Sequence, residues 1–242
     1  AEHLWGRETA ETEEMLRDEL GDAKIKVAQI GIAGERLVRY AAIMSDVNRA
    51  AGRTGLGAAK GSKGRKAVAV RGRQQAKPAD RGALTEVAKW LGQNYKQEVG
   101  WAVRMGTVSG VRNLNKVGGL PTKAFSQPQY DDVEKVSGHL MHETILVGRD
   151  TCQSCPIRCK QVIANEDAGG VYNISPVYGG PEYETMAAFG SNCRLDNLLA
   201  VAKANERCAA YGLDTISTGM VIAFVMECVE HGLLTRERTG GY

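Results

Sequence analysis

The spacing of apolar residues changes at about Gly72, and this change constrains the fold of the chain more than any other feature. The segment at 24–32, KIKVAQIGI, alternates and is rich in β-branched residues, which is typical of a strand. The segment at 84–99, LTEVAKWLGQNYKQEV, instead places its apolar residues at helical spacing. Between them, RGRQQAKPADRG is polar and contains Pro78, so we place a domain boundary there. The sequence therefore predicts an α+β fold, with the strands in residues 1–72 and a mainly α-helical domain in residues 73–242.

The rest of the first part contains one clear helix and one ambiguous segment. Residues 8–20 predict an amphipathic helix with Thr9 or Thr12 as its N-cap. Residues 66–71, KAVAVR, predict a second strand. Residues 37–44, LVRYAAIM, fit either the continuation of a strand or the start of a helix, and the pattern does not decide between them.

The second part is predicted to end in a pair of helices. Residues 111–125, VRNLNKVGGLPTKAF, first predict a loop, because glycines and a proline interrupt them. Helices are then expected over about 196–211 and 218–231. Ser217 or Thr218 is the expected N-cap of the second helix.

Composition and charge exclude several classes of protein. The 242 residues are 43% hydrophobic and 24% charged, which is ordinary for a soluble globular protein. Mean hydropathy is −0.29, and no apolar run reaches the ~18 residues that a membrane span needs. The first residues, AEHLWGRETAETEE, are polar and acidic and lack an initiator Met, so we expect no signal peptide and a chain cut from a longer protein. The net charge of +3 is too small to indicate a nucleic-acid partner.

Three of the six cysteines, Cys152, Cys155 and Cys159, lie within eight residues. Thiolates favour Fe–S clusters, zinc or copper(I), and this spacing can hold three corners of a cubane while a fourth ligand comes from elsewhere. Zinc is the weaker alternative, because no second ligand pair follows the loop, and His139 and His142 lie upstream of it. Crowded cysteines also argue against a disulfide framework and for a reducing compartment, the cytoplasm. The cysteines expected to be small core residues are Cys193, Cys208 and Cys228.

A basic stretch, Val47–Ala79, contains no acidic residue and nine basic ones. This concentration suits an anionic ligand, although a solvated basic loop fits equally well. Within the stretch, GRTGLGAAKGSKGRK has neither the Walker pattern nor the dinucleotide fingerprint. Its glycines would let backbone N–H groups approach a ligand, and Arg53, Lys60 and Lys63 could supply charge for a phosphate.

Two acidic features have both a structural and a functional interpretation. The motif GPEYET places Glu182 and Glu184 just before an apolar helix, where carboxylates complement the helix dipole. The motif YGLDTISTG puts Asp214 on a short connection after Gly212, which can end a helix in the left-handed conformation. Asp214 is either an ordinary capping residue or a carboxylate that grips the guanidine-like edge of a pterin through paired hydrogen bonds.

Several stretches together resemble the tungsten-containing aldehyde:ferredoxin oxidoreductase family. They are GRTGLGAAKGSKGRKAVAVRG, GLPTKAF, CQSCPIRC, GPEYETMAAFGSNC and AKANERCAAYGLDTISTGMVIAF, in family order over nearly the whole chain. The resemblance implies an internal fragment of a larger protein. Residues 1–72 would end the β-rich domain that forms one base for a tungsten-bis(molybdopterin) cofactor. Residues 73–242 would form most of a helical domain with the iron–sulfur cysteines and a pterin-binding motif.

The resemblance also implies roles for individual residues. Glu184 would be the general base or proton relay near tungsten, with Glu182 as the fallback, and a bridging magnesium would lie near Thr54. The family's first pterin-binding Asp falls on Ala209, and its fourth cluster cysteine and active-site His fall beyond Tyr242. The cofactor-binding residues would be Arg53, Thr54, Leu56, Gly57, Leu213 and Asp214. The ligands of a [4Fe–4S] cluster would be Cys152, Cys155 and Cys159.

The implied reaction is the two-electron oxidation of a small aldehyde to a carboxylic acid, with water as the oxygen source. The cluster would pass electrons to ferredoxin or to an Fe–S electron-transfer subunit, in an oligomeric enzyme. One alternative is a reductive member of the family, such as a benzoyl-CoA reductase catalytic subunit or a carboxylate reductase. The other is an Fe–S electron-transfer subunit with a vestigial pterin site, which only Ala209 favours.

Overall fold

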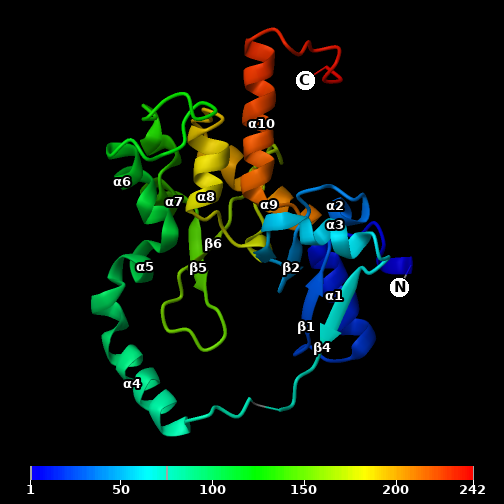
Figure 1. Cartoon of the computed structure of the whole chain (residues 1–242), viewed down its shortest axis with the longest axis vertical. Helices are drawn as coiled ribbons and strands as arrows, with labels where there is room; N and C mark the ends of the chain where they lie inside the picture. The colour runs from blue at the N-terminus through cyan, green and yellow to red at the C-terminus, as the bar shows by residue number, and fades with distance from the viewer. Residues whose placement is uncertain (1, 75, 242) are drawn as a thin grey trace.

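The computed structural model describes residues 2–74 and 76–241, and a strand-containing part precedes a larger helical part (Figure 1). Helix α4 (Arg81–Glu98) stands apart from the body of the molecule (Figure 1). This architecture confirms the predicted α+β fold. Among the described helices, none is both long and apolar enough to cross a membrane.

The first part is built on an antiparallel sheet with the strand order β3-β2-β1-β4. β1 pairs with β4 so that Lys26 lies opposite Val70. Both predicted strands are confirmed, but β1 is shorter than 24–32 because the chain turns after Ile30 into the short helix α2. The strands are β1 Lys26–Gln29, β2 Ile43–Ser45, β3 Arg49–Ala51 and β4 Ala67–Val70, and a separate hairpin pairs β5 Leu146–Asp150 with β6 Lys160–Ile163.

The ambiguous segment at 37–44 is mostly neither strand nor helix. It consists of turns, with Leu37 at a φ of 57°, and strand β2 begins only at Ile43. Ala41 forms an isolated antiparallel bridge with Leu213. The segment therefore takes its backbone partners from the far end of the chain, which local sequence patterns cannot indicate.

Helices account for most of the remaining chain. The α-helices are α1 Thr9–Leu20, α2 Ile32–Glu35, α3 Leu56–Gly61, α4 Arg81–Glu98, α5 Gly100–Met105, α6 Gly110–Lys116, α7 Gly138–Thr144, α8 Tyr183–Thr185, α9 Leu198–Tyr211 and α10 Thr215–Glu230. A π-helical turn at Met186–Ser191 continues α8. Short 3₁₀ helices lie at Glu2–Leu4, Arg53–Gly55, Gly106–Ser109, Val133–Val136 and Pro176–Tyr178.

The predicted N-cap of the first helix was wrong. Glu8 is the N-cap of α1, and it forms a capping box with Glu11. Thr9 and Thr12 are fully buried instead, and the Thr9 hydroxyl donates to the Ala209 carbonyl at 2.9 Å. Burial against α9 has outweighed the capping preference of threonine.

The loop predicted at 111–125 was also partly wrong, because α6 occupies its first residues. Val111 is buried in the main core, and Leu114 packs against the same core. The apolar face of a short helix is therefore satisfied by tertiary packing, and the glycines and proline take effect only after Lys116.

Helix α10 begins earlier than predicted, because Asp214 is its N-cap in place of Ser217 or Thr218. The Asp214 carboxylate accepts a hydrogen bond from the Ser217 backbone N–H at 3.0 Å. The structural interpretation of Asp214 is thus confirmed, and it leaves room for a second role at the same carboxylate.

Two buried clusters organise the packing. The larger lies within the helical part and includes Met141, Ile163, Met186 and Val201, each at most 1% exposed. The smaller lies where the two parts meet, and its members are Ala42, Met44, Val47, Tyr178, Ala209 and Ala210. The second cluster therefore joins the strand-containing part to the end of α9.

Backbone hydrogen bonds fix that junction. The Ala42 N–H donates to the Gly212 carbonyl at 2.7 Å, and the Asp214 N–H donates to the Tyr40 carbonyl at 3.1 Å. Gly212 ends α9 at a φ of 71°, a left-handed conformation that glycine adopts without strain. Gly31 lies against the same turn. The connection between α9 and α10 is thereby held on the first part of the chain.

We predict that Gly31→Ala weakens this junction. An added Cβ would lie 2.2 Å from the Tyr211 carbonyl carbon and oxygen, so two backbone segments would have to separate. Overpacking of this kind costs about 1–3 kcal/mol. The matched control is Gly92→Ala inside exposed α4, where nothing lies within 4 Å and the change should stabilise by about 0.5–1 kcal/mol. Thermal unfolding of the two variants should show shifts of opposite sign, and an unshifted Gly31→Ala protein would contradict this account.

Candidate functional site

A cavity of about 370 Å³ opens at the junction of the two parts. It gathers side chains from segments that lie more than 100 residues apart in the sequence. Among its lining residues are Asn48, Arg49, Gly52 and Arg53 of the first part and Lys160, Glu182, Glu184, Asn205, Ala209, Leu213 and Asp214 of the second. The structure therefore brings together five residues that the sequence singled out, namely Arg53, Glu182, Glu184, Leu213 and Asp214.

Asp214 forms the polar centre of this cavity. Its side chain is only 6% exposed, and its Oδ2 pairs with the Arg53 guanidinium at 2.9 Å. The same Oδ2 accepts hydrogen bonds from the backbone and side chain of Ser217. No described residue donates to Oδ1, which would lie 2.9 Å from a Cβ added at Gly52. One carboxylate thus caps a helix, orients an arginine and keeps an acceptor free for a ligand.

The two glutamates of GPEYET have different surroundings. Glu182 accepts a hydrogen bond from the Thr107 hydroxyl at 2.5 Å and lies 3.6 Å from the Lys160 ammonium. Glu184 is exposed on the cavity and has neither a hydrogen bond nor an ion pair with any described residue. The Glu184 carboxylate is therefore free at the cavity. The Glu182 carboxylate is instead held by Thr107 and Lys160.

The other proposed cofactor residues of the Gly-rich segment do not line the cavity. Thr54 is exposed in a left-handed conformation, and its hydroxyl donates to the Arg53 carbonyl. Leu56 is 45% exposed. Gly57 is buried, and an added Cβ would lie 2.5 Å from the Ala42 carbonyl oxygen. Of these residues, Gly57 has a packing role that is evident from the structure alone.

The three clustered cysteines lie on the loop between β5 and β6. Cys152 is exposed, and Cys155 and Cys159 are half-buried. The Thr151 hydroxyl donates to the Cys152 and Cys155 carbonyls, and these bonds fix the backbone of the loop. Among the described residues, no group of three or more His, Cys, Asp or Glu side chains converges on a metal ion. Burial, followed by the negative charge of Glu182, raises the pKa of the Cys159 thiol.

Two of the remaining cysteines are core residues, as predicted. Cys193 and Cys208 are 4% and 3% exposed. Burial raises the pKa of Cys193 to about 11 and that of Cys208 to about 12, so both are neutral thiols at physiological pH. Cys228 is half-buried on α10. Neither Cys193 nor Cys208 lies on the loop of the clustered cysteines.

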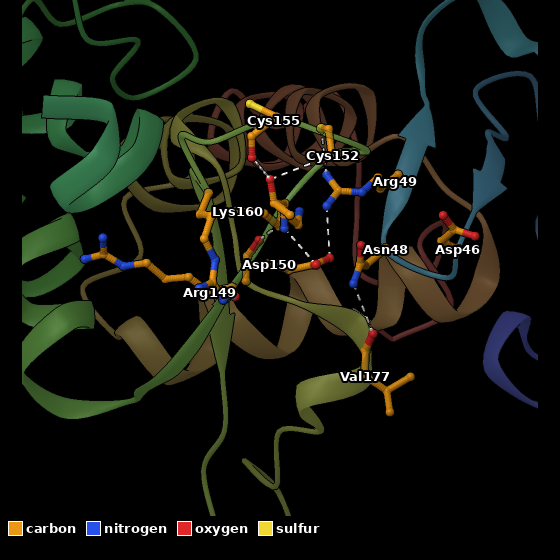
Figure 2. A network of polar contacts seen from close by, with 12 residues as sticks. Asp46, Asn48, Arg49, Arg149, Asp150, Cys152, Cys155, Lys160 and Val177 are labelled. Atoms are coloured by element: carbon orange, nitrogen blue, oxygen red, sulfur yellow. Dashed lines mark hydrogen bonds and ion pairs between the residues drawn. The ribbon is translucent and has the colours of Figure 1, made fainter. Parts of the chain in front are cut away.

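Sequence reasoning missed three polar residues of the site. Arg49 contacts the cysteine loop, with its guanidinium beside Asp150 and Cys152 (Figure 2). Lys160 lines the cavity with a side chain only 12% exposed. Asn205 is 8% exposed and also lines the cavity. The only available signal was indirect, because Lys160 follows the last clustered cysteine and Asn205 precedes Ala209 by one helical turn.

These groups fit a large anionic cofactor bearing hydrogen-bonding edges. The cavity is lined by three cationic side chains, which can pair with anionic groups of a ligand, and by three carboxylates. The cationic residues are Arg49, Arg53 and Lys160, and the carboxylates belong to Glu182, Glu184 and Asp214. The free Oδ1 of Asp214 offers a hydrogen-bond acceptor. The side-chain amide of Asn205 offers both a donor and an acceptor. The three cysteines of the loop between β5 and β6, one exposed and two half-buried, form an all-sulfur donor set, which suits an iron–sulfur cluster.

Comparisons with known proteins agree with this geometry. Residues 1–72 match the family model described as aldehyde ferredoxin oxidoreductase, N-terminal domain, and residues 83–242 match that described as aldehyde ferredoxin oxidoreductase, domains 2 and 3. The chain is 38% identical over 246 residues to the tungsten-containing aldehyde ferredoxin oxidoreductase of Thermococcus kodakarensis, covering 99% of this chain and 39% of that protein. It is 39% identical to the protein of the same description from Pyrococcus furiosus, with the same coverage.

The fold of this chain is also similar to that of a solved structure. The active site complex BamBC of benzoyl coenzyme A reductase, in complex with 1,5 dienoyl-CoA, aligns with a TM-score of 0.73 and 25% identity. The alignment covers 97% of this chain and 37% of the solved chain. Likewise, the chain spans only 39% of the length of the two aldehyde ferredoxin oxidoreductases described above. Because the two family models together cover nearly all of its length, the chain belongs to the aldehyde ferredoxin oxidoreductase family.

Proposed function

We propose that this chain is the central part of a tungsten-pterin, iron–sulfur oxidoreductase that converts an aldehyde to a carboxylic acid. The observation that carries the proposal is the cavity in which Arg53, Asp214 and the unpaired Glu184 meet at the domain junction. Residues 1–72 would supply one wall as the end of the cofactor-base domain. Residues 73–242 would supply the other wall and the cysteine loop.

The residues present can be assigned to two groups that the enzyme would bind. Arg53 and the peptide groups around Gly52 would hold one face of the tungstopterin, with Asp214 and Leu213 at a pterin edge. A magnesium ion at the cofactor phosphates is proposed near Thr54. Cys152, Cys155 and Cys159 would supply three ligands of a [4Fe–4S] cluster. When bound, the tungsten centre supplies the two-electron redox chemistry, and the protein orients it.

Glu184 would move the proton in this reaction. Its carboxylate faces the cavity and has no partner among the described residues, so it is free to accept a proton from water. Lys160 and the Thr107 hydroxyl hold Glu182 instead, which leaves that residue to position the wall. Asp214 keeps Arg53 aimed along the cavity and so orients the anionic ligand.

The comparisons favour the oxidation of an aldehyde over the reductive alternative. The aldehyde ferredoxin oxidoreductases are 37–39% identical to this chain, whereas the benzoyl-CoA reductase complex is 25% identical. Electrons from the reaction would leave through the cluster to a ferredoxin or to an electron-transfer subunit. A relative of Pyrococcus furiosus with 29% identity, named aliphatic sulfonate oxidoreductase, WOR-like subunit, supports a subunit partner of this kind.

Metal content tests the proposed function. We predict that the full-length enzyme, purified anaerobically, contains tungsten and about four irons per chain. Cys155→Ala should abolish the visible absorption of the cluster because it removes a thiolate ligand. Cys208→Ala is the control, because it trims a buried side chain at a cost of about 1 kcal/mol and should leave the cluster intact. Zinc without iron in the wild-type enzyme, or equal loss of the cluster in both variants, would refute the assignment.

A second prediction separates the two glutamates. Glu184→Gln should keep tungsten and iron at normal occupancy and lower kcat about 10²–10⁴-fold, the usual contribution of an acid–base group. Glu182→Gln can still accept the Thr107 hydrogen bond and should affect kcat far less. The measurement is steady-state aldehyde oxidation with a viologen acceptor, together with the metal content of each variant. Full activity in Glu184→Gln would rule out its role, and a loss confined to Glu182→Gln would reverse the two assignments.

A further inference from the structure

Arg49 joins the sheet of the first part to the cysteine loop of the second. Its Nη2 donates to Asp150 Oδ2 at 2.9 Å, and its Nη1 donates to the Cys152 thiol sulfur at 3.4 Å (Figure 2). The bond to Asp150 is partly buried, whereas the bond to Cys152 lies at the exposed surface of the loop. One guanidinium therefore joins strand β3 to a loop more than 100 residues later in the sequence, and it contacts a proposed cluster ligand, Cys152.

The same arginine also lines the cavity. Arg49 belongs to strand β3, and Arg53 follows it by four residues on the same wall. On the loop side, Asp150 Oδ1 accepts from the Thr151 N–H at 2.7 Å, and the Thr151 hydroxyl donates to the Cys155 carbonyl at 2.6 Å. Arg49 thus stands between the cavity and the cysteines, and it is tied to the network that orders the loop.

We propose that Arg49 is a positioning residue that raises the reduction potential of the cluster, an inference that rests on the proposed function. Reduction adds one negative charge to the cluster and its thiolates. A cationic N–H donor on the Cys152 sulfur stabilises that charge, because hydrogen bonds to the sulfurs help to set cluster potentials. The ion pair with Asp150 holds the guanidinium in place without removing its second donor.

The test is the midpoint potential of the cluster in the anaerobically purified, full-length enzyme, followed by EPR and visible absorption. Arg49→Met should retain the iron and shift the midpoint to lower potential. Arg49→Lys keeps the charge but cannot serve Asp150 and Cys152 together, so its midpoint should lie between those of the wild type and Arg49→Met. Arg71→Met is the matched control, because Arg71 pairs with Asp22 and should leave the midpoint unchanged.

The outcomes distinguish this inference from the proposed function. A wild-type enzyme without iron would refute the proposed function itself. An iron-containing wild type whose midpoint is unchanged in Arg49→Met would refute only the role of Arg49. Loss of iron from both Arg49 variants would also overturn the inference, because the residue would then be needed to build the cluster site.

A second inference concerns Asn205, a residue for which the sequence pattern predicts no role. Asn205 lies on α9, is 8% exposed and lines the cavity. Its side-chain amide makes no hydrogen bond with any described residue. Ala209 lies four residues later on the same face of the helix and also lines the cavity. The polar atoms of this amide are not among the buried atoms that lack a partner, so they open onto the cavity, where they are available to hydrogen-bond a ligand.

The geometry points to Asn205 as a cofactor-binding residue that replaces the carboxylate missing at Ala209, and this too rests on the proposed function. An amide offers a donor and an acceptor side by side, which complements a pterin edge that presents both. The methyl group of Ala209 can make no such bond. The free Oδ1 of Asp214 lines the same cavity and would provide a second acceptor.

The experiment measures pterin content, from the fluorescence of the oxidised pterin released from the purified full-length enzyme. Asn205→Leu keeps a side chain of similar size but removes the amide donor and acceptor, so this variant should bind less pterin. In protein produced without the cofactor, the same change should leave the thermal midpoint unchanged or raise it. Adding Ala209→Asp to Asn205→Leu should restore pterin.

Unchanged pterin content in Asn205→Leu would overturn this assignment. A lower thermal midpoint in the cofactor-free variant would overturn it as well, because the amide would then have a structural partner. If the wild-type enzyme itself releases no pterin, that result refutes the proposed function rather than the role of Asn205.

Discussion

The site depends on one strip of backbone pairing, in which Tyr40 and Ala42 exchange hydrogen bonds with Asp214 and Gly212. These bonds hold the turn between α9 and α10 against the first part of the chain. The turn can approach so closely because Gly31 presents no side chain to it. Together with the buried cluster at the junction, this strip brings the Asp214 carboxylate to within 2.9 Å of the Arg53 guanidinium. The cavity therefore follows from backbone geometry before any cofactor is considered.

Asp214 shows how a capping residue can also serve a site. A helix N-cap needs one carboxylate oxygen, and Oδ2 satisfies the Ser217 N–H. The second oxygen remains free at the cavity wall, held rigidly by the helix that the first oxygen caps. Because the same Oδ2 also pairs with Arg53, the helix cap and the position of the arginine at the cavity depend on a single buried group. The capping and ligand-binding interpretations of this residue are thus compatible.

Local features of the chain could be predicted from its sequence, and contacts between distant segments could not. The cysteine spacing and the helix end at Gly212 are local signals of this kind. The α+β fold was predicted from the change of apolar spacing at about Gly72. The helix of residues 110–116 was missed because its stability comes from burying Val111 and Leu114. The contacts of Arg49 and the position of Asn205 at the cavity could not be predicted for a related reason. Each depends on a neighbour or a cavity wall contributed by a remote segment.

We propose above that the junction cavity binds tungsten and that the cysteine loop binds iron. Anomalous X-ray scattering from crystals of the anaerobically purified enzyme, measured at the tungsten and iron absorption edges, tests it directly. We expect a tungsten peak in the cavity bounded by Arg53, Glu184 and Asp214, and an iron peak beside Cys152, Cys155 and Cys159. A tungsten peak elsewhere, or zinc scattering at the cysteine loop, would contradict the account.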